Sequence, residues 1–200
     1  MKYFKISILI FFLLASIFSY GKERCIKKKG KILMVIAYKY FRDEEYAIPR
    51  EILEKNGWEV TVASWKKGTA VGMLGKKVKV DLGLEKVNPD EYFGVIFVGG
   101  IGTVKLFDNK IAHKIAKEFY RSQKIIGAIC FGPVILARSG ILKGKKATCF
   151  YTKSKELEKY GAKYTGKSVE IDGRIITANG PKAAKEFVEK FIQLLKIYEK

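Results

Sequence analysis

Three runs of nearly continuous apolar residues, each about as long as one β-strand, constrain the fold of this chain. They cover residues 31–37, 93–98 and 125–129. A strand that is apolar on both faces is typical of a parallel sheet with helices on each side. Segments with helical spacing of apolar residues alternate with these runs, at residues 45–56, 108–122 and 183–197. The pattern therefore predicts an α/β fold, with a doubly wound, mostly parallel sheet flanked by helices.

The remaining segments predict the edges of the sheet and its connections. Residues 58–63 follow the first helix as a second strand. Pro49 is expected in the first turn of that helix, and Asn56 with Gly57 at its end. Further expected elements are a hairpin over 78–87 at the sheet margin, a helix over 134–139, a strand over 146–150, a helix over 154–160 and paired strands over 168–171 and 174–178.

The N-terminal residues have the pattern of an export signal. Lys2 and Lys5 precede an apolar stretch over residues 6–18, and small residues follow at the positions that a signal peptidase reads. An uncleaved N-terminal anchor is the alternative, and it would be the one route to a membrane. We therefore expect an extracytoplasmic protein: secreted, periplasmic or on the outer face of a membrane. The domains predicted are a signal peptide over 1–21, a basic lead segment over 22–30 and a single α/β domain over 31–200.

The composition narrows the class of partner. The 39 basic and 20 acidic residues give a formal net charge of +19. The lysines are scattered as pairs and single residues, so we interpret them as a solvated surface without a specific nucleic-acid site. The chain has few Asn and Gln residues and many Lys and Glu residues. This composition is typical of proteins from hot environments, so we expect a thermophilic source. The cysteines lack C-x-x-C spacing and the chain has a single histidine, so we expect neither a metal nor another cofactor.

One short motif indicates chemistry. Residues 128–133 read Ala-Ile-Cys-Phe-Gly-Pro and place Cys130 between a buried strand and a predicted helix. Such a turn is the cysteine counterpart of the serine nucleophile elbow, where backbone N–H groups help to bind an oxyanion. The helix N-terminus should also lower the pKa of the thiol. The alternative is a buried structural cysteine at a tight turn.

Four pieces of sequence, in this order and spacing, resemble the ThiJ/PfpI superfamily. They are the strand over 31–37 leading to Glu44-Glu45 and Ile48-Pro49, the segment Val98-Gly99-Gly100, the Cys130 motif, and Ile176-Thr177-Ala178 before the last helix. The superfamily includes PfpI-type peptidases and the parkinsonism-associated protein deglycase. The resemblance runs from about residue 31 to residue 195 and implies a flavodoxin-like fold, similar to class I glutamine amidotransferases.

The resemblance also implies roles for individual residues. Cys130 matches the nucleophile, and Glu45 matches the acid that lies against it and carries a proton. Gly99 and Gly100, with the N–H of Phe131, match the oxyanion pocket. Taken without the resemblance, Glu45 is an ordinary first-turn helix acid and the glycines end a strand. Glu44 should point elsewhere.

The chain departs from the peptidases at Phe131, where they carry a histidine that acts as base. The histidine of this chain, His113, lies opposite Ile111, Ile115 and Phe119 on its predicted helix, so we expect it on the solvated face. Without imidazole, protonation of an amine leaving group has no obvious donor, which weakens the prediction of proteolysis. Cys149 is interpreted as a small core residue rather than a resolving thiol for Cys130.

The leading hypothesis is an exported, cysteine-dependent enzyme that acts on a small carbonyl or acyl substrate, as a glyoxalase, a deglycase or a hydrolase. A PfpI-type cysteine peptidase with an atypical site is the first alternative. The second is a redox sensor or protective protein in which Cys130 is oxidised without turnover. Binding of an acidic partner through the basic surface is the third. The resemblance further implies a homo-oligomer, a dimer or larger.

Overall fold

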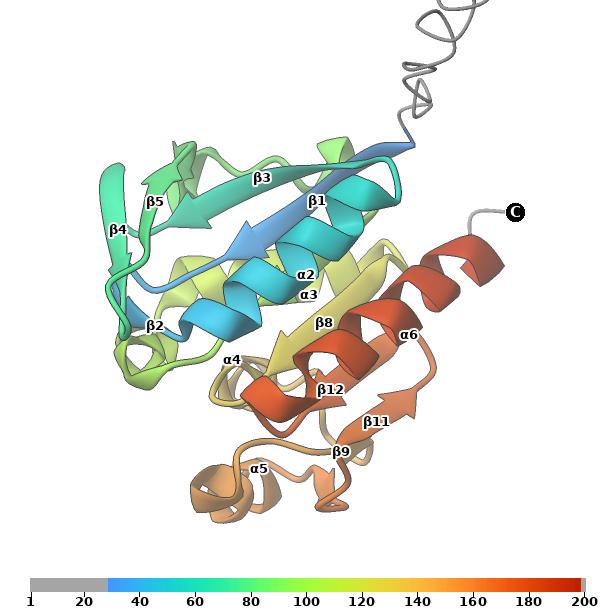
Figure 1. The fold of residues 1–200 in the computed structure, drawn as a ribbon. Coiled ribbons are helices and arrows are strands. Elements are labelled where there is room, and N and C mark those ends of the chain that lie inside the picture. The colour runs from blue at the N-terminus through green and yellow to red at the C-terminus, as the bar shows by residue number, and fades with distance from the viewer. Residues whose placement is uncertain (1–28, 199–200) are drawn as a thin grey trace, which may run out of the picture.

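The structure is a computed structural model that describes residues 29–198. A seven-stranded sheet lies at its centre (Figure 1). In spatial order its strands are β11 (Val169–Asp172), β12 (Ile175–Ala178), β8 (Ile125–Ile129), β7 (Gly94–Phe97), β1 (Gly30–Val35), β3 (Trp58–Ser64) and β6 (Leu82–Gly83). All neighbours run parallel except β11 and β12, which form an antiparallel pair at one edge. The predicted doubly wound, mostly parallel sheet is confirmed.

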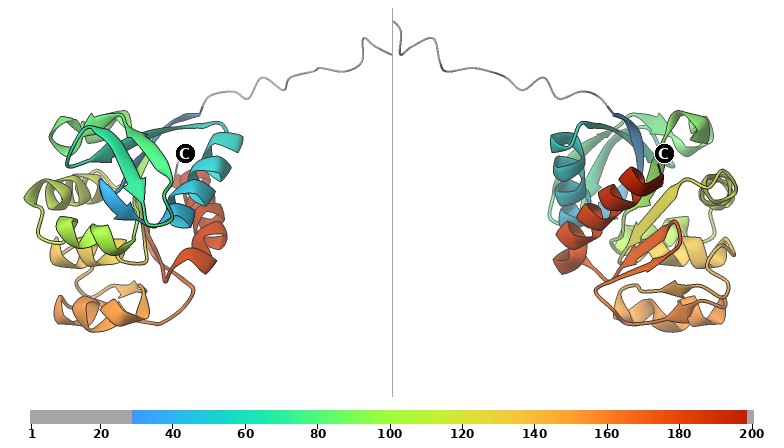
Figure 2. Two further views of the ribbon diagram at one scale, coloured as in Figure 1. Left: turned by 60° about the vertical axis from the view of Figure 1, so that its left-hand side comes forward. Right: turned by 90° about the vertical axis from the view of Figure 1, so that its right-hand side faces the viewer.

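Helices cover both faces of the sheet because its central strands are apolar on both sides. Along β1, Ile32 and Met34 pack into one core, and Leu33 and Val35 pack into the other. Figure 2 shows α2 (Asp43–Lys55) beside α6 (Ala184–Tyr198) on one face, and α3 (Lys110–Arg121) with α4 (Gly132–Arg138) on the other. The remaining helices are α5 (Ser154–Lys159) and the 3₁₀ helices Leu84–Lys86, Pro89–Glu91, Ile101–Leu106, Tyr151–Lys153 and Pro181–Ala183.

The order of the strands determines where the loops meet. The chain passes from β1 outward to β3 and then returns across β1 to β7. The loops that leave the carboxyl ends of β1 and β7 therefore diverge, and such a switch point is the usual ligand site of an open α/β sheet. The Cys130 turn follows β8 at the same edge of the sheet.

A small second sheet replaces the hairpin predicted over 78–87. Its strands are β2 (Lys39–Phe41), β4 (Gly68–Gly72) and β5 (Lys77–Val80), with β4 and β5 antiparallel. The predicted hairpin is wrong because β5 ends at Val80 and β6 begins at Leu82 in the other sheet. Between them, the side chain of Asp81 accepts the N–H of Val62 at 2.8 Å and so holds the chain beside β3. A further two-stranded sheet pairs β9 (Lys146–Ala147) with β10 (Lys163–Tyr164).

Three other expectations need correction. Helix α2 begins at Asp43, so Pro49 lies in its second turn and not in its first. The strand predicted over 146–150 ends at Ala147, since Phe150 donates its N–H to the carbonyl oxygen of Cys130 at 3.0 Å. On α3, Ile111 is 40 % exposed, although its spacing placed it on the apolar face.

The structure describes only the end of the predicted N-terminal lead segment. The predicted signal peptide over residues 1–21 and most of the lead segment over 22–30 lie outside the described residues. Lys29 donates its N–H to Gly57 at 3.0 Å, and Gly30 opens β1, so the last two residues of the predicted lead already belong to the fold.

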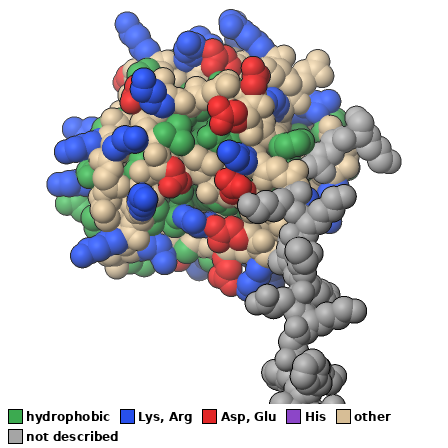
Figure 3. Space-filling model, turned by 90° about the horizontal axis from the view of Figure 1, so that it is seen from above, with side chains coloured by type: hydrophobic (Ala, Val, Ile, Leu, Met, Phe, Trp, Pro, Cys, Tyr) green, Lys and Arg blue, Asp and Glu red, His purple; other side chains and the backbone are tan. Residues whose placement is uncertain are grey.

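The basic side chains are distributed over the surface. In the view of Figure 3, Lys and Arg side chains project around the molecule with Asp and Glu among them. This is consistent with a solvated surface rather than one basic groove. Within residues 29–198, no helix combines the length and the hydropathy that crossing a bilayer requires.

Candidate active site

Cys130 occupies a sharp turn between β8 and α4. Its φ of +61° lies in the left-handed region, which a side chain with a Cβ adopts at a cost of about 1–3 kcal/mol. Two backbone hydrogen bonds hold this conformation: Cys130 donates to Ala178 at 2.8 Å and accepts from Phe150 at 3.0 Å. Gly132 begins the helix directly behind, where a Cβ would overlap the carbonyl oxygen of Phe97. The structure thus has the strained strand-to-helix elbow that the sequence predicts.

Glu45 is the carboxyl group beside the thiol. It lies in the first turn of α2, is fully buried, and accepts the N–H of Gly99 through Oε2 at 3.1 Å. The thiol of Cys130 donates a hydrogen bond to the same carboxyl group. Its other oxygen, Oε1, is buried without a hydrogen-bond partner among residues 29–198. The structure therefore brings Cys130 and Glu45 together.

Gly99 allows this contact through its lack of a side chain. A Cβ at Gly99 would lie 2.5 Å from Oε2 of Glu45 and 2.6 Å from Cβ of Cys130. Both distances are shorter than van der Waals contact, so only glycine fits between the two groups. Sequence reasoning placed Gly99 in the oxyanion pocket. The structure instead directs its N–H to Glu45.

The N–H groups of Gly100 and Phe131 approach the sulfur. Both form backbone hydrogen bonds to the thiol of Cys130. Gly100 has a φ of +106°, and a Cβ there would overlap the backbone of Arg42. The loop after β7 therefore packs against the segment that leads into α2. Two donors aimed at one sulfur can also hold an oxygen that develops negative charge next to it.

Burial controls the protonation of the pair. It raises the pKa of Glu45 to about 8, although the hydrogen bonds from Cys130 and Gly99 and the charge of Arg42 lower it in part. Glu45 is therefore mostly protonated at neutral pH, as the resemblance implies. Burial is also the main cause that raises the pKa of Cys130. The negative charge that Glu45 carries once it ionises raises the pKa of Cys130 further. The N–H groups of Gly100 and Phe131 lower it, but by less.

The prediction of a lowered pKa for Cys130 is thus wrong. Helix α4 has seven residues, and a dipole that short does not offset a thiol that is only 7 % exposed beside a carboxyl group. The geometry favours a thiol that gives its proton to Glu45 as a bond forms and as Glu45 gives its own proton away, rather than a preformed thiolate.

Aromatic rings surround the elbow. The ring of Phe131 lies 6.2 Å from that of Phe107 and 6.0 Å from that of Phe150, measured between centroids. His113 is half-buried, and its Nε2 lies 2.6 Å from the carbonyl oxygen of Phe107. The expectation that His113 lies on a solvated face is therefore wrong. Its ring hydrogen-bonds to Phe107 rather than to Cys130 or Glu45.

The other cysteines stand apart from the chemistry. Cys149 is fully buried in the core on the opposite face of the sheet from Cys130, and its thiol donates to the carbonyl oxygen of Phe150 at 3.3 Å. Burial raises its pKa to about 12, which makes it a poor nucleophile. Cys25 lies outside the described residues. Within residues 29–198, no three His, Cys, Asp or Glu side chains gather as metal ligands.

Two residues that support Glu45 were missed from the sequence. Asp43 accepts the N–H groups of Leu74 and Lys76, each at 2.8 Å, and so fixes the β4–β5 turn to the start of α2. Arg42 pairs with Glu44 through Nε at 2.8 Å, which turns Glu44 away from the thiol as expected. Three consecutive acids after an arginine are a common helix start, so no local signal separates their roles.

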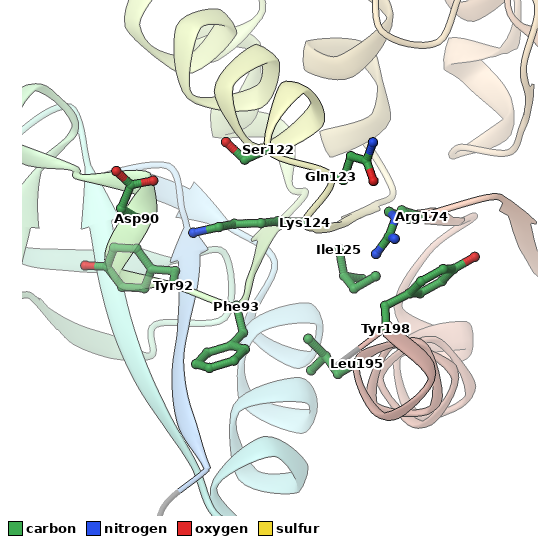
Figure 4. A pocket seen from close by; sticks show the side chains of 10 residues that line it. All are labelled: Asp90, Tyr92, Phe93, Ser122, Gln123, Lys124, Ile125, Arg174, Leu195 and Tyr198. Carbon is green, nitrogen blue, oxygen red and sulfur yellow. The ribbon is translucent and has the colours of Figure 1, made fainter. Parts of the chain in front are cut away.

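A hollow of about 330 Å³ lies at the other edge of the sheet (Figure 4). Phe93, Ile125 and Arg174 line it, and they stand at the amino ends of β7, β8 and β12. Arg174 stacks on the ring of Tyr198 at 3.7 Å. Because Cys130 follows the carboxyl end of β8, this hollow is separate from the candidate site.

Comparison with known proteins gives one consistent result. The profile of the DJ-1/PfpI family matches residues 30–194. An uncharacterized protein of Methanocaldococcus jannaschii is 45 % identical over 183 residues, covering 90 % of this chain and 88 % of its own. Deglycase PfpI of Pyrococcus furiosus is 34 % identical over 166 residues, covering 83 % and 99 %. The crystal structure of a ThiJ/PfpI domain protein from Brachyspira murdochii aligns with a TM-score of 0.83 at 35 % identity, covering 85 % and 98 %.

Proposed function

The chain belongs to the DJ-1/PfpI family, and on this premise we propose that it is a cysteine-dependent enzyme that acts on small carbonyl or acyl compounds. Cys130 forms the bond to the carbonyl carbon, and Glu45 carries the proton. The observation that supports this best is the carboxyl group of Glu45, held between the N–H of Gly99 and the thiol of Cys130. The deglycase name of the Pyrococcus furiosus relative favours a small carbonyl substrate over a peptide.

The first step is addition of the thiol to an aldehyde or ketone. The S–C bond forms, the π bond of the carbonyl breaks, and the N–H groups of Gly100 and Phe131 bind the oxygen as it becomes negative. Glu45, which is mostly protonated at neutral pH, gives its own proton to that oxygen and takes the thiol proton in exchange, which yields a hemithioacetal. Glu45 suits both transfers because its pKa of about 8 lies near neutral pH.

Incubation of the purified protein with methylglyoxal, with hemithioacetals of small thiols and with casein tests this proposal. We expect consumption of the carbonyl compounds that is absent from Cys130→Ser, and little cleavage of casein. Oxidation of Cys130 without consumption of any carbonyl compound would favour a redox sensor instead.

We also propose that the protein forms a homo-oligomer. The exposed apolar side chains Tyr40, Ile101 and Val104 are 54, 56 and 50 % exposed and line a hollow of about 580 Å³. Ile101 directly follows Gly100, so a second copy on this patch would border the site. Sedimentation velocity of Ile101→Glu should show a shift to monomer. Leu74→Glu, which changes a 66 % exposed residue elsewhere, should sediment like wild type.

Finally, we propose that the chain is exported. The support is the sequence of residues 1–21, with two lysines before an apolar stretch. Expression of the full chain followed by cell fractionation and N-terminal sequencing tests this. Recovery from the cytosol with an intact Met1 would contradict it.

A further inference from the structure

The ammonium group of Lys153 lies over the ring of Phe131, the residue that follows Cys130. Its Nζ lies 4.9 Å from the centroid of the Phe131 ring and 5.8 Å from that of Phe107. The side chain is half-buried in a 3₁₀ helix that is bonded to the elbow. Lys153 donates its N–H to Phe150 at 2.8 Å, and Phe150 donates to Cys130 at 3.0 Å. The backbone of Lys153 is therefore tied to the Cys130 turn by two successive hydrogen bonds.

This charge is not neutralised within the described part of the chain. Arg138, which also lies over Phe107, is bound by the carboxylates of Asp108 at 2.6 Å and Glu156 at 2.7 Å. Lys153 has no carboxylate of residues 29–198 within 4 Å. The two cations thus share an aromatic neighbour, but only Lys153 remains available to an anion from outside.

The other charged groups of the site do not compete for such an anion. Arg42 is paired with Glu44. Glu45 is buried behind Gly99. The aromatic rings around Lys153 carry no charge and exclude water, which strengthens its interaction with a negative group. Lys153 therefore holds a positive charge without a carboxylate partner among residues 29–198, beside the aromatic side chain that directly follows Cys130.

We propose that Lys153 binds the carboxylate of the substrate, and that the preferred substrates are small 2-oxo acids, in which a carboxylate adjoins the reactive carbonyl. This inference rests on the proposed function for its carbonyl chemistry. Lys153 is a specificity-determining residue in this scheme: it attracts the anion, while Cys130 adds to the carbonyl carbon and Glu45 gives its proton to the carbonyl oxygen and takes the thiol proton.

Alkylation of Cys130 tests the charge without relying on turnover. Iodoacetate and iodoacetamide transfer similar groups to sulfur with loss of iodide and the thiol proton, and they differ in one negative charge. We define the ratio as the rate with iodoacetate divided by the rate with iodoacetamide, both measured at Cys130 by peptide mass spectrometry at neutral pH. This ratio should fall about three- to tenfold in Lys153→Met. The iodoacetamide rate should stay unchanged, which shows that the fold and the thiol are intact. Lys153→Arg should restore the ratio.

Lys155→Met is the matched control, because it removes the same charge from an exposed position two residues along. Its ratio should equal that of wild type. An unchanged ratio in Lys153→Met, or an equal fall in Lys155→Met, overturns the inference.

Turnover of glyoxylate and methylglyoxal separates this inference from the proposed function. We expect Lys153→Met to raise KM for the anion glyoxylate and to leave KM for neutral methylglyoxal unchanged. If the alkylation ratio falls but wild type consumes neither compound, the anion site stands and the proposed function fails. If wild type consumes both through Cys130 but the ratio is unaffected, the function stands and the role of Lys153 fails.

Discussion

The carboxyl group of Glu45 accepts a hydrogen bond from the thiol of Cys130 while its Oε2 accepts the N–H of Gly99 at 3.1 Å. The three groups come from α2, from the turn after β8 and from the loop after β7. Glu45 and Cys130 are both buried, so their protonation states depend on each other more than on solvent. The predictions about pH follow from this arrangement.

The reactivity of Cys130 should follow the ionisation of Glu45. With a pKa of about 8, Glu45 becomes a carboxylate as the pH rises through that value and can then accept the thiol proton. The rate of alkylation by neutral iodoacetamide should therefore rise with an inflection near pH 8. Glu45→Gln should lack this inflection and Glu44→Gln should keep it. Identical profiles for wild type and Glu45→Gln would exclude Glu45 as the proton acceptor.

The same pKa predicts how stability changes with pH. Glu45 has an ordinary value of 4.5 and rises to about 8 in the folded protein, so between these values the folded state binds more protons than the unfolded state. Stability should therefore be highest below about pH 4.5, as far as this group is concerned, and fall as the pH rises through 8. A tenfold difference in proton affinity between the folded and unfolded states corresponds to about 1.4 kcal/mol.

Urea unfolding at a series of pH values measures this slope. In Glu45→Gln the loss of stability between pH 4.5 and 8 should be much smaller than in wild type, since an amide does not titrate. A wild-type curve that rises over this interval, with the rise abolished in Glu45→Gln, would show that the sign is wrong.

Gly99→Ala should inactivate the protein. The new methyl group would contact both Glu45 and Cys130 at or below 2.6 Å, and the overpacking should cost about 1–3 kcal/mol of stability. Gly140→Ala is the control: it has nothing within 4 Å but a φ of +87°, so it loses a similar amount of stability through strain alone. The two variants should unfold at similar urea concentrations, and only Gly140→Ala should retain activity on methylglyoxal.

The elements that the sequence predicted are those with a strong local pattern. The central strands β1, β7 and β8 are apolar on both faces, and that pattern leaves few alternatives. Helix α3 has Asn109 at its N-cap, where the side chain accepts the N–H groups of Ile111 and Ala112. The elbow at Cys130 was also predictable, because a strand that ends directly before a helix leaves little chain for the turn.

The features that the sequence did not predict depend on distant residues. Strand β4 reads Gly-Thr-Ala-Val-Gly, which has little strand character, and it is held between β2 and β5. The protonation of Cys130 depends on how deeply the fold buries it and on Glu45 from another element. The partner of His113 is a carbonyl oxygen six residues earlier, which no periodicity indicates.

His113→Ala should reduce stability and leave the chemistry intact. The imidazole hydrogen-bonds to the carbonyl oxygen of Phe107, and the loss of such a bond costs about 1 kcal/mol. Because the Phe107 ring packs against Phe131, a change in KM for carbonyl substrates would show that the effect reaches the site. We expect KM to stay within about twofold of wild type.

Phe131 is the position at which this protein should differ from peptidases. Its N–H reaches the Cys130 thiol, but its aromatic ring cannot protonate the amine that leaves when a peptide bond is cleaved. Phe131→His keeps the N–H and adds an imidazole next to the nucleophile, so hydrolysis of a casein peptide should rise. Phe131→Ala keeps the N–H without a proton carrier and should not raise it. Strong proteolysis by wild type that disappears in His113→Ala would overturn this explanation, because it would make His113 the proton donor.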